Sequence, residues 1–512
     1  MNLLHNPSVA IMSGVVRYPE APPFHPSQAF PEYPFGPHDV RGANDVYAGV
    51  RECFRLLGLD AANFGTPQWN PLGDLIVPGQ KVLIKPNFVL HWNAGGGPLD
   101  AVITHGSVIR AVADYVFIAL KGKGELVIAD APQMNCDLAK LFQANGMDGV
   151  SAFLSSAYSG RGVKVGVYDL REERTIYRYG IIWRRISLDR SPDRTVPVVL
   201  GRESYLEGID ASRLYGADYD RRVVVAAHQH HQHEYRVSSE VLSSDVVISI
   251  PKLKVHSKVG TTLNIKNLVG INRDKNHLAH YRIGPPAEGG DEIAKAQWDD
   301  TVDRWLSDRL LGHFWKSGRY PFVAWRVVRY LLNRMAPARS SVQHYGNWHG
   351  NDTAWRMALD LHRILLTADA TGKIQAKPVR TFFSVIDGVI AGEGNGPLHP
   401  DPYPAGVLIS GFNPVTVDWH ATRLMGFDPE HVPMYRNAAI QMLDWVEDYD
   451  VNSANIVSNQ PAIPDAVRQC QGTAAPVFTF RAPPGWVGTM ELYAGAKEAA
   501  LFPEPEFNRI LQ

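Results

Sequence analysis

A short apolar run that opens into a row of cations constrains the fold of this chain most. The run Val246–Ile250 predicts a buried strand, and Pro251 ends it. Basic side chains then follow in alternation at Lys252, Lys254, His256 and Lys258, and another comes at Lys266. Open α/β sheets hold their ligands at the carboxyl ends of the strands. The stretch therefore predicts an α/β fold with an anion site in a cleft.

Three further apolar runs predict strands of the same sheet, which we expect to be mainly parallel and flanked by helices. The four runs are Lys81–Ile84, Glu125–Ala129, Val246–Ile250 and Phe382–Ile386. Between the first two, apolar residues recur at helical spacing after Thr104, which we expect to be the N-cap. The order strand, helix, strand is typical of a parallel sheet with crossover helices. Asp130, at the end of the second strand, either binds a ligand or caps the following turn.

Changes in pattern divide the 512 residues into four predicted parts. Residues 1–150 form an N-terminal α/β part. Residues 151–235 form a β-rich insertion, because 163–188 alternates apolar with charged residues as exposed antiparallel strands do. Residues 236–461 form a second α/β part that holds the Lys/His stretch and a glycine-rich loop. Residues 462–512 are a C-terminal extension, in which 477–480 predicts a strand.

Charge and cysteine content narrow the class of protein. The 51 basic and 52 acidic residues give a net charge of -1, which argues against nucleic acid as a partner. The three cysteines, Cys53, Cys136 and Cys470, lack metal-binding spacing and predict a cytoplasmic protein. No apolar run approaches the roughly 18 residues of a membrane helix. Residues 304–335 have a basic amphipathic pattern, which suits contact with a membrane surface but more commonly packs on the protein's own core.

A glycine-rich stretch after the fourth predicted strand supplies carboxylates. Asp387 follows that strand, and Glu393 and Asn395 alternate with glycines. Such a stretch predicts a loop whose backbone approaches a ligand closely, although it matches neither the phosphate loop nor the dinucleotide fingerprint. Asp387 and Glu393 are the predicted ligands of a divalent ion such as Mg²⁺, which prefers carboxylate oxygens.

A second candidate for metal binding is the histidine-rich sequence HQHHQHEY. On a strand, His228 and His230 face away from His231 and His233, so that at most two of them converge. Neither a cysteine nor a regular helical spacing supports the set. The pattern therefore gives metal binding here little support.

Three motifs in order carry a resemblance to a known family. They are PGQKVLIKPNFV, IPKLKVHSKVGTTLNIKNLVGI, and VIDGVIAGEGNGPL followed by GFNPVTVDWHATRLMG. Together they span about 78–426 and resemble the domain of unknown function 362 family. Many members of that family carry an added ferredoxin-like cysteine cluster, which this chain lacks. By position, the resemblance points to Lys85, Asn87, Lys252, Lys254, His256, Lys266, Asn267, Asp387, Glu393, Asn395 and Asp418.

The leading hypothesis is an enzyme that acts on a small phosphorylated or carboxylated molecule. His256 is the predicted acid or base, because an ordinary histidine pKa of about 6.5 lies near working pH. Asp387 and Glu393 complete the predicted catalytic set. The predicted substrate-binding residues are Lys85, Asn87, Lys252, Lys254, Lys266, Asn267 and Asn395. Two alternatives remain: a binding module for a charged metabolite, and a redox protein that uses a separate ferredoxin partner.

Two geometric expectations follow from these assignments. His256 and Glu393 should face one cavity, with Lys85 and Asp387 on its walls, because a parallel sheet delivers its strand ends to one edge. Lys252 and Lys254 should be exposed, so that replacing both by alanine removes anion binding and leaves the melting temperature nearly unchanged.

Overall fold

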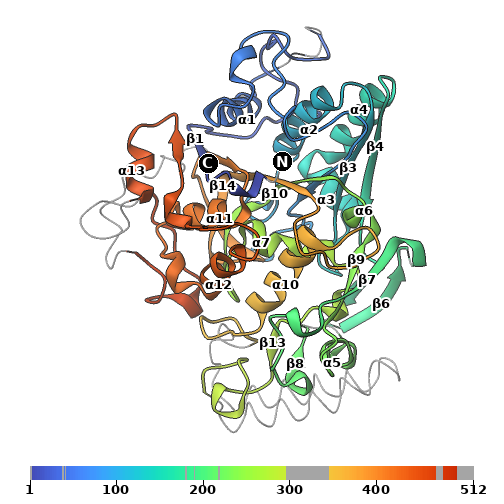
Figure 1. The fold of residues 1–512 in the computed structure, drawn as a ribbon, viewed down its shortest axis with the longest axis vertical. Helices are drawn as coiled ribbons and strands as arrows, with labels where there is room; N and C mark the ends of the chain where they lie inside the picture. The colour runs from blue at the N-terminus through green and yellow to red at the C-terminus, as the bar shows by residue number, and fades with distance from the viewer. Residues whose placement is uncertain are drawn as a thin grey trace.

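The protein has an α/β fold around one large mixed sheet (Figure 1). The structure is a computed structural model that describes residues 3–36, 40, 42–178, 181–189, 191–216, 220–295, 345–468 and 477–492. The main path of the sheet has the strand order β17-β1-β16-β14-β10-β2-β3-β4. The amphipathic segment 304–335 lies outside the described residues, so its predicted role stays a prediction.

The four predicted strands lie side by side and parallel in the centre of this sheet. They are β2 (Lys81–Pro86), β3 (Gly124–Asp130), β10 (Val246–Ile250) and β14 (Thr381–Asn395). Val246 of β10 is in register with Val82 on one side and with Thr381 on the other. The predicted parallel arrangement is confirmed, and it brings the carboxyl ends of these strands to one edge.

The sheet continues on both sides of this centre. β4 (Val163–Asp169) pairs in parallel with β3. On the other side, β16 (Val407–Gly411) runs antiparallel to β14, and β1 (Val9–Ser13) runs antiparallel to β16. The edge strand β17 (Ile456–Ser458) is parallel to β1. Residues 163–169 were predicted as part of an antiparallel insertion, and this is wrong, because they extend the main sheet.

Helices cover both faces of the sheet, and alternate residues of each strand supply the two hydrophobic cores. Val82 and Ile84 pack with α1 (Asp45–Leu56), α2 (Gly106–Leu120), α3 (Leu138–Asn145) and α4 (Met147–Ser159). Leu83 and Val247 belong to the opposite core, with α7 (Leu263–Asn267), α10 (Ala354–Thr367), α11 (Pro414–Leu424), α12 (Pro433–Met442) and α13 (Ala462–Arg468). In Figure 1, α1, α2 and α4 gather at the top of the view.

Small antiparallel sheets follow the first half of the main sheet, at the lower right and bottom of Figure 1. β5 (Glu173–Arg178) pairs with β6 (Ile181–Ser187), and β7 (Thr195–Val199) pairs with β9 (Glu234–Ser238). β8 (Leu214–Tyr215) pairs with β13 (Tyr281–Arg282), beside α5 (Arg221–His228), and α6 (Ser239–Leu242) leads into β10. This part confirms an antiparallel β insertion that begins after β4.

The glycine-rich stretch is a strand and not a loop, which corrects the prediction. β14 continues for 15 residues to Asn395 and turns back into β15 (His399–Tyr403). The row of cations likewise forms β11 (Lys252–His256), which pairs with the outer half of β14 and with β12 (Gly260–Thr261). A Cβ on Gly392 would lie 2.6 Å from the carbonyl oxygen of Ala101. This glycine therefore permits close packing of backbone.

Two smaller predictions also fail. The N-cap of α2 is His105, whose Nδ1 accepts from the backbone N–H of Ser107, whereas the Thr104 hydroxyl donates to the carbonyl of Ile250. Residues 477–480 form no strand, although Phe478 and Phe480 are buried and their backbone N–H groups bond to the end of α11 and the residue after it.

Candidate functional site

A cavity of about 800 Å³ opens where β2, β3 and β11 end. Its walls come from the segments that follow these strands, from 262–270 and from the turn between β14 and β15. The lining includes six of the predicted side chains: Asn87, Lys254, His256, Lys266, Asn267 and Asn395. The predicted cleft at the strand ends therefore exists.

The charges on the cavity wall are strongly unbalanced. The basic lining residues are Lys254, His256, Lys258, Lys266, Lys275, His280 and His399. The one carboxylate among the described lining residues is Asp130. Lys258, Lys275 and His280 were not among the predicted catalytic or substrate-binding residues, although all three lie in the basic stretch, whose run of charges is the signal that identifies them.

The Asp130 carboxylate is neutralised by Lys85 beneath the cavity. Lys85 Nζ lies 2.7 Å from Asp130 Oδ1, and both side chains are buried. The same ammonium donates to Asn267 Oδ1 at 3.0 Å, and Asn87 Nδ2 donates to that oxygen at 3.1 Å. Burial lowers the pKa of Lys85 and raises that of Asp130, and the pairing opposes both shifts. Lys85 is therefore engaged within the protein and does not line the cavity.

Gly270 makes room for this ion pair, and its replacement is expected to disrupt the pair. A Cβ at this position would lie 1.9 Å from Asp130 Oδ1 and 2.5 Å from Lys85 Nζ. We expect Gly270→Ala to lower the free energy of unfolding by about 2 kcal/mol, because overpacking and a broken buried contact both destabilise. Urea unfolding measures this change. Gly160→Ala is the matched control, since its Cβ would approach no atom closer than 3.3 Å; equal effects of the two substitutions would contradict the assignment.

Lys266 differs from the other lysines of the cavity wall. Lys254 Nζ donates to the carbonyl of Val102 at 2.5 Å, and Lys275 Nζ donates to that of Val269 at 3.0 Å. Lys258 Nζ donates to the carbonyl of Tyr345. Lys266 Nζ makes no hydrogen bond or ion pair with any described residue, although Lys266 is only 7% exposed.

Burial and mutual repulsion shift the pKa values of these lysines downward. Burial, and then the charge of Lys258, lower the pKa of Lys266 to about 7. Burial lowers the pKa of Lys275 to about 7 as well, against the attraction of Asp130. The pKa of Lys254 lies well below its ordinary value, because of burial and of repulsion from Lys252 and Lys266.

Two histidines of the cavity, His256 and His280, are neutral at pH 7. Burial and the neighbouring lysines hold the pKa values of His256 and His280 well below the ordinary value. His256 Nδ1 accepts from the backbone N–H of Lys258 at 3.1 Å. The proton of its neutral ring is then on Nε2, so His256 offers a hydrogen-bond donor. The nitrogen that a general base would use is already occupied.

Lys252 and Asp387 form a buried ion pair away from the cavity wall. Lys252 Nζ lies 3.1 Å from Asp387 Oδ2, and both side chains are 0% exposed. The Tyr18 hydroxyl donates to Asp387 Oδ1 at 2.6 Å, and the backbone N–H of His105 donates to Oδ2 at 2.9 Å. The expectation that Lys252 and Lys254 are exposed is wrong, because β11 is inside the protein.

Glu393 is held by the C-terminal part of the chain. Arg481 Nε and the Arg481 backbone N–H donate to its two carboxylate oxygens at 2.7 and 2.8 Å. Asn395 lines the cavity with His256, but Glu393, Asp387 and Lys85 are not among the lining residues. The expectation that these side chains share a cavity with His256 is therefore not met.

Asp418, the last residue that the resemblance points to, positions α7. Its Oδ1 accepts from the backbone N–H and the amide side chain of Asn264, and its Oδ2 accepts from the backbone N–H of Ile265. Burial raises its pKa to about 7. These bonds fix the short helix that carries Lys266 and Asn267 to the cavity.

The proposed metal ligands do not converge. Asp387 and Glu393 are bound by Lys252 and Arg481, and no group of three His, Cys, Asp or Glu side chains suited to a metal occurs in the described part of the chain. The histidine-rich sequence lies at the end of α5 and in a turn, not on a strand as assumed. There His231 and His233 both contact Glu207.

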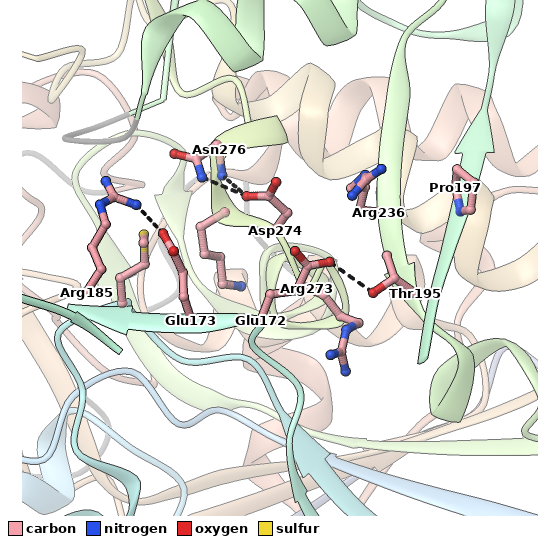
Figure 2. A pocket seen from close by; sticks show the side chains of 11 residues that line it. Glu172, Glu173, Arg185, Thr195, Pro197, Arg236, Arg273, Asp274 and Asn276 are labelled. Atoms are coloured by element: carbon pink, nitrogen blue, oxygen red, sulfur yellow. Dashed lines mark hydrogen bonds and ion pairs between the residues drawn. The ribbon is translucent and has the colours of Figure 1, made fainter. Parts of the chain in front are cut away.

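A second cavity, of about 660 Å³, adjoins the first (Figure 2). Met134 and Lys275 line both cavities. Its carboxylates have partners within the wall: Arg185 pairs with Glu173, and the hydroxyl of Thr195 donates to Glu172 at 2.9 Å. Arg273, also on this wall, donates to the carbonyl of Asp189 at 2.5 Å. The mixed charges make this cavity a weaker candidate than the first.

Sequence comparison identifies the family. Residues 82–156 and 187–423 match the family described as "Domain of unknown function (DUF362)", and the chain belongs to that family. It is similar to the "Thylakoid-associated protein sll1697" of Synechocystis sp., with 22% identity over 362 residues. The match covers 71% of this chain and 68% of the relative.

No described helix is both long and apolar enough to span a membrane. The name of the relative associates that protein with thylakoids. A cytoplasmic location for this chain stays a prediction.

Proposed function

We propose that the protein binds a small phosphorylated or carboxylated molecule in the cavity at the strand ends. The observation that carries the proposal is the wall itself, whose described residues include four lysines and one carboxylate, which Lys85 neutralises. An anion in this position supplies the counter-charge that the buried lysines lack. It also accepts a hydrogen bond from His256.

The size and the apolar part of the wall define the kind of molecule. A cavity of about 800 Å³ has the volume of a small-molecule site. Phe88, Val89, Leu90 and Trp92 line it beside the cationic residues. This combination fits an organic molecule with an acidic group better than a bare inorganic ion. Nucleic acid is not a partner in this proposal.

An enzymatic role rests on Lys266 rather than on the carboxylates. Asp387 and Glu393 are engaged in ion pairs outside the cavity, which removes the support for metal-assisted chemistry by these two residues. Lys266, with a pKa of about 7, exchanges a proton near neutral pH. The binding-module alternative needs the anion site alone. The redox alternative, with a separate ferredoxin partner, predicts visible absorption by the purified protein.

Anion binding is expected to weaken as the pH rises above 7. A bound anion raises the pKa values of Lys266 and Lys275 above their free values of about 7, so the complex binds more protons than the free protein does. The affinity for the anion is then greatest below pH 7. It falls as the pH rises from the lysine pKa values of the free protein toward the higher pKa values of the complex. Calorimetric titration with inorganic pyrophosphate at pH 6, 7.5 and 9 measures how the affinity depends on pH.

The matched control for the titration is Lys164→Met, which removes an exposed lysine of β4 and should leave the affinity unchanged. A pyrophosphate affinity that is the same at all three pH values, or absence of binding at pH 6, would overturn the proposed site.

A further inference from the structure

We infer that Lys266 is a nucleophilic amine that forms a Schiff base with the carbonyl group of the bound molecule. The inference rests on the proposed anion site and names the substrate class as an acidic carbonyl compound, such as a 2-oxo acid or a phosphorylated aldehyde. Of the four lysines on the described wall, Lys266 is the one whose nitrogen no carbonyl oxygen holds. Its amine is therefore available to a ligand in the cavity.

The charged groups around Lys266 favour its free amine. Lys254 and His256 come from β11, Lys258 follows that strand, and Lys275 and His280 come from the segment after α7. None of these neighbours carries a negative charge, and Asp130 is paired with Lys85. Because its pKa is about 7, close to half of the Lys266 side chain is unprotonated at neutral pH. Repulsion by neighbouring cations and desolvation are established ways to activate a lysine nucleophile.

The backbone that carries Lys266 is held in place before a ligand arrives. Asp418 is fully buried and accepts three hydrogen bonds from Asn264 and Ile265, at 2.7 to 2.9 Å. Asn267, the residue after Lys266, donates to the backbone carbonyl of Lys85 at 3.2 Å. A rigid short helix thus presents Lys266 to the cavity, as a preorganised nucleophile requires.

The covalent step balances without a further reactant. The lone pair of Lys266 Nζ attacks the carbonyl carbon, a C–N bond forms, and the carbonyl oxygen takes up a proton. The C–O bond then breaks, and the oxygen leaves as water with one hydrogen from the amine and one proton from solvent. The nitrogen keeps one hydrogen and a positive charge. This iminium group withdraws electrons from the adjacent carbon, while the other lysines bind the acidic group.

The test uses pyridoxal 5′-phosphate, which carries both an aldehyde and a phosphate, followed by reduction with sodium borohydride. Peptide mass spectrometry of the full chain locates the label. We expect one label per chain, on Lys266, formed at pH 7 at least about 100-fold faster than on ordinary exposed lysines, whose pKa of about 10.4 keeps them protonated. Inorganic pyrophosphate should protect Lys266, and with the probe well below saturation the labelling rate should rise with a midpoint near pH 7, the pKa of Lys266 in the free protein.

Two variants check the assignment. Lys266→Arg keeps the charge but cannot form a Schiff base, so the label should disappear, and Lys164→Arg should leave it in place. Labelling of Lys254 or Lys275 in preference to Lys266, or labelling spread over exposed lysines, would overturn the inference. If pyrophosphate binds in calorimetry and Lys266 is not labelled, the Schiff-base inference fails and the anion site stands. If pyrophosphate does not bind, the proposed function itself fails.

Discussion

Lys252→Met is expected to lower the free energy of unfolding by about 3 to 5 kcal/mol. The substitution keeps most of the side-chain volume and removes the charge that neutralises Asp387, 3.1 Å away. Both side chains are 0% exposed, and breaking a buried ion pair by removing one partner leaves an uncompensated charge in the interior. Chemical denaturation of the purified variant measures the change.

The matched design separates the charge from the packing. Asp387→Asn in the Lys252→Met background removes the unpaired charge, and we expect it to restore part of the lost stability. Lys164→Met, at an exposed position, should change the stability by less than about 1 kcal/mol. A Lys252→Met protein as stable as the parent would show that Lys252 does not hold Asp387.

The central sheet could be predicted because its strands carry their own signal. Val82, Val127, Val247 and Phe383 belong to short apolar runs in which alternate residues face the two helical layers. Such runs indicate strands without knowledge of the partners. The location of the cleft could then be predicted from these strands, since the carboxyl ends of parallel strands lie at one edge of a sheet.

The roles of the individual lysines could not be predicted, because they depend on partners distant in the sequence. Lys85 meets Asp130 across 45 positions, and Lys252 meets Asp387 across 135. Lys252 and Lys254 alternate along one strand, yet the first pairs with a carboxylate and the second bonds to carbonyl groups at the cavity. Spacing alone does not distinguish a paired lysine from one that faces a ligand.

The same limit applies to the glycine-rich stretch. Glu393 and Asn395 were both predicted as site residues, but Gly394 between them has φ of +68°, which interrupts the regular strand geometry. Glu393 is then bound by Arg481, 88 residues further along the chain, while Asn395 lines the cavity. Nothing in the local sequence reports the position of Arg481.

The four lysines of the described cavity wall, and two of its histidines, nevertheless lie within the basic stretch that follows the strand Val246–Ile250. Lys254, His256 and Lys266 were predicted as site residues, and Lys275 and His280 lie in the same run. The repeated basic side chains between two apolar elements were the usable signal. Asp387 and Glu393 were assigned to the site because the glycine-rich stretch offers carboxylate oxygens suited to a divalent ion, and the ion pairs of the folded chain removed them from it.

Lys266→Met is expected to weaken pyrophosphate binding at least about tenfold and at the same time to stabilise the protein. The lost contact is a charge-assisted one, which accounts for the weaker binding. The free energy of unfolding rises because the Lys266 ammonium is buried without a carboxylate partner among the described residues. Removing the ammonium ends the cost of burying its charge, which is on the order of 3 kcal/mol at pH 6. Thermal and urea unfolding measure the gain.

The pH dependence of that gain is the decisive part of the prediction. The folded pKa of Lys266, about 7, lies below the value of about 10.4 that an unfolded lysine has. Between these values the unfolded chain binds more protons, so the parent protein gains stability from this group as the pH rises. The advantage of Lys266→Met should therefore be largest at pH 6 and vanish near pH 10, whereas Lys164→Met should show no such trend. A variant that is less stable than the parent at pH 6 would show that Lys266 has a partner that stabilises its charge in the folded protein.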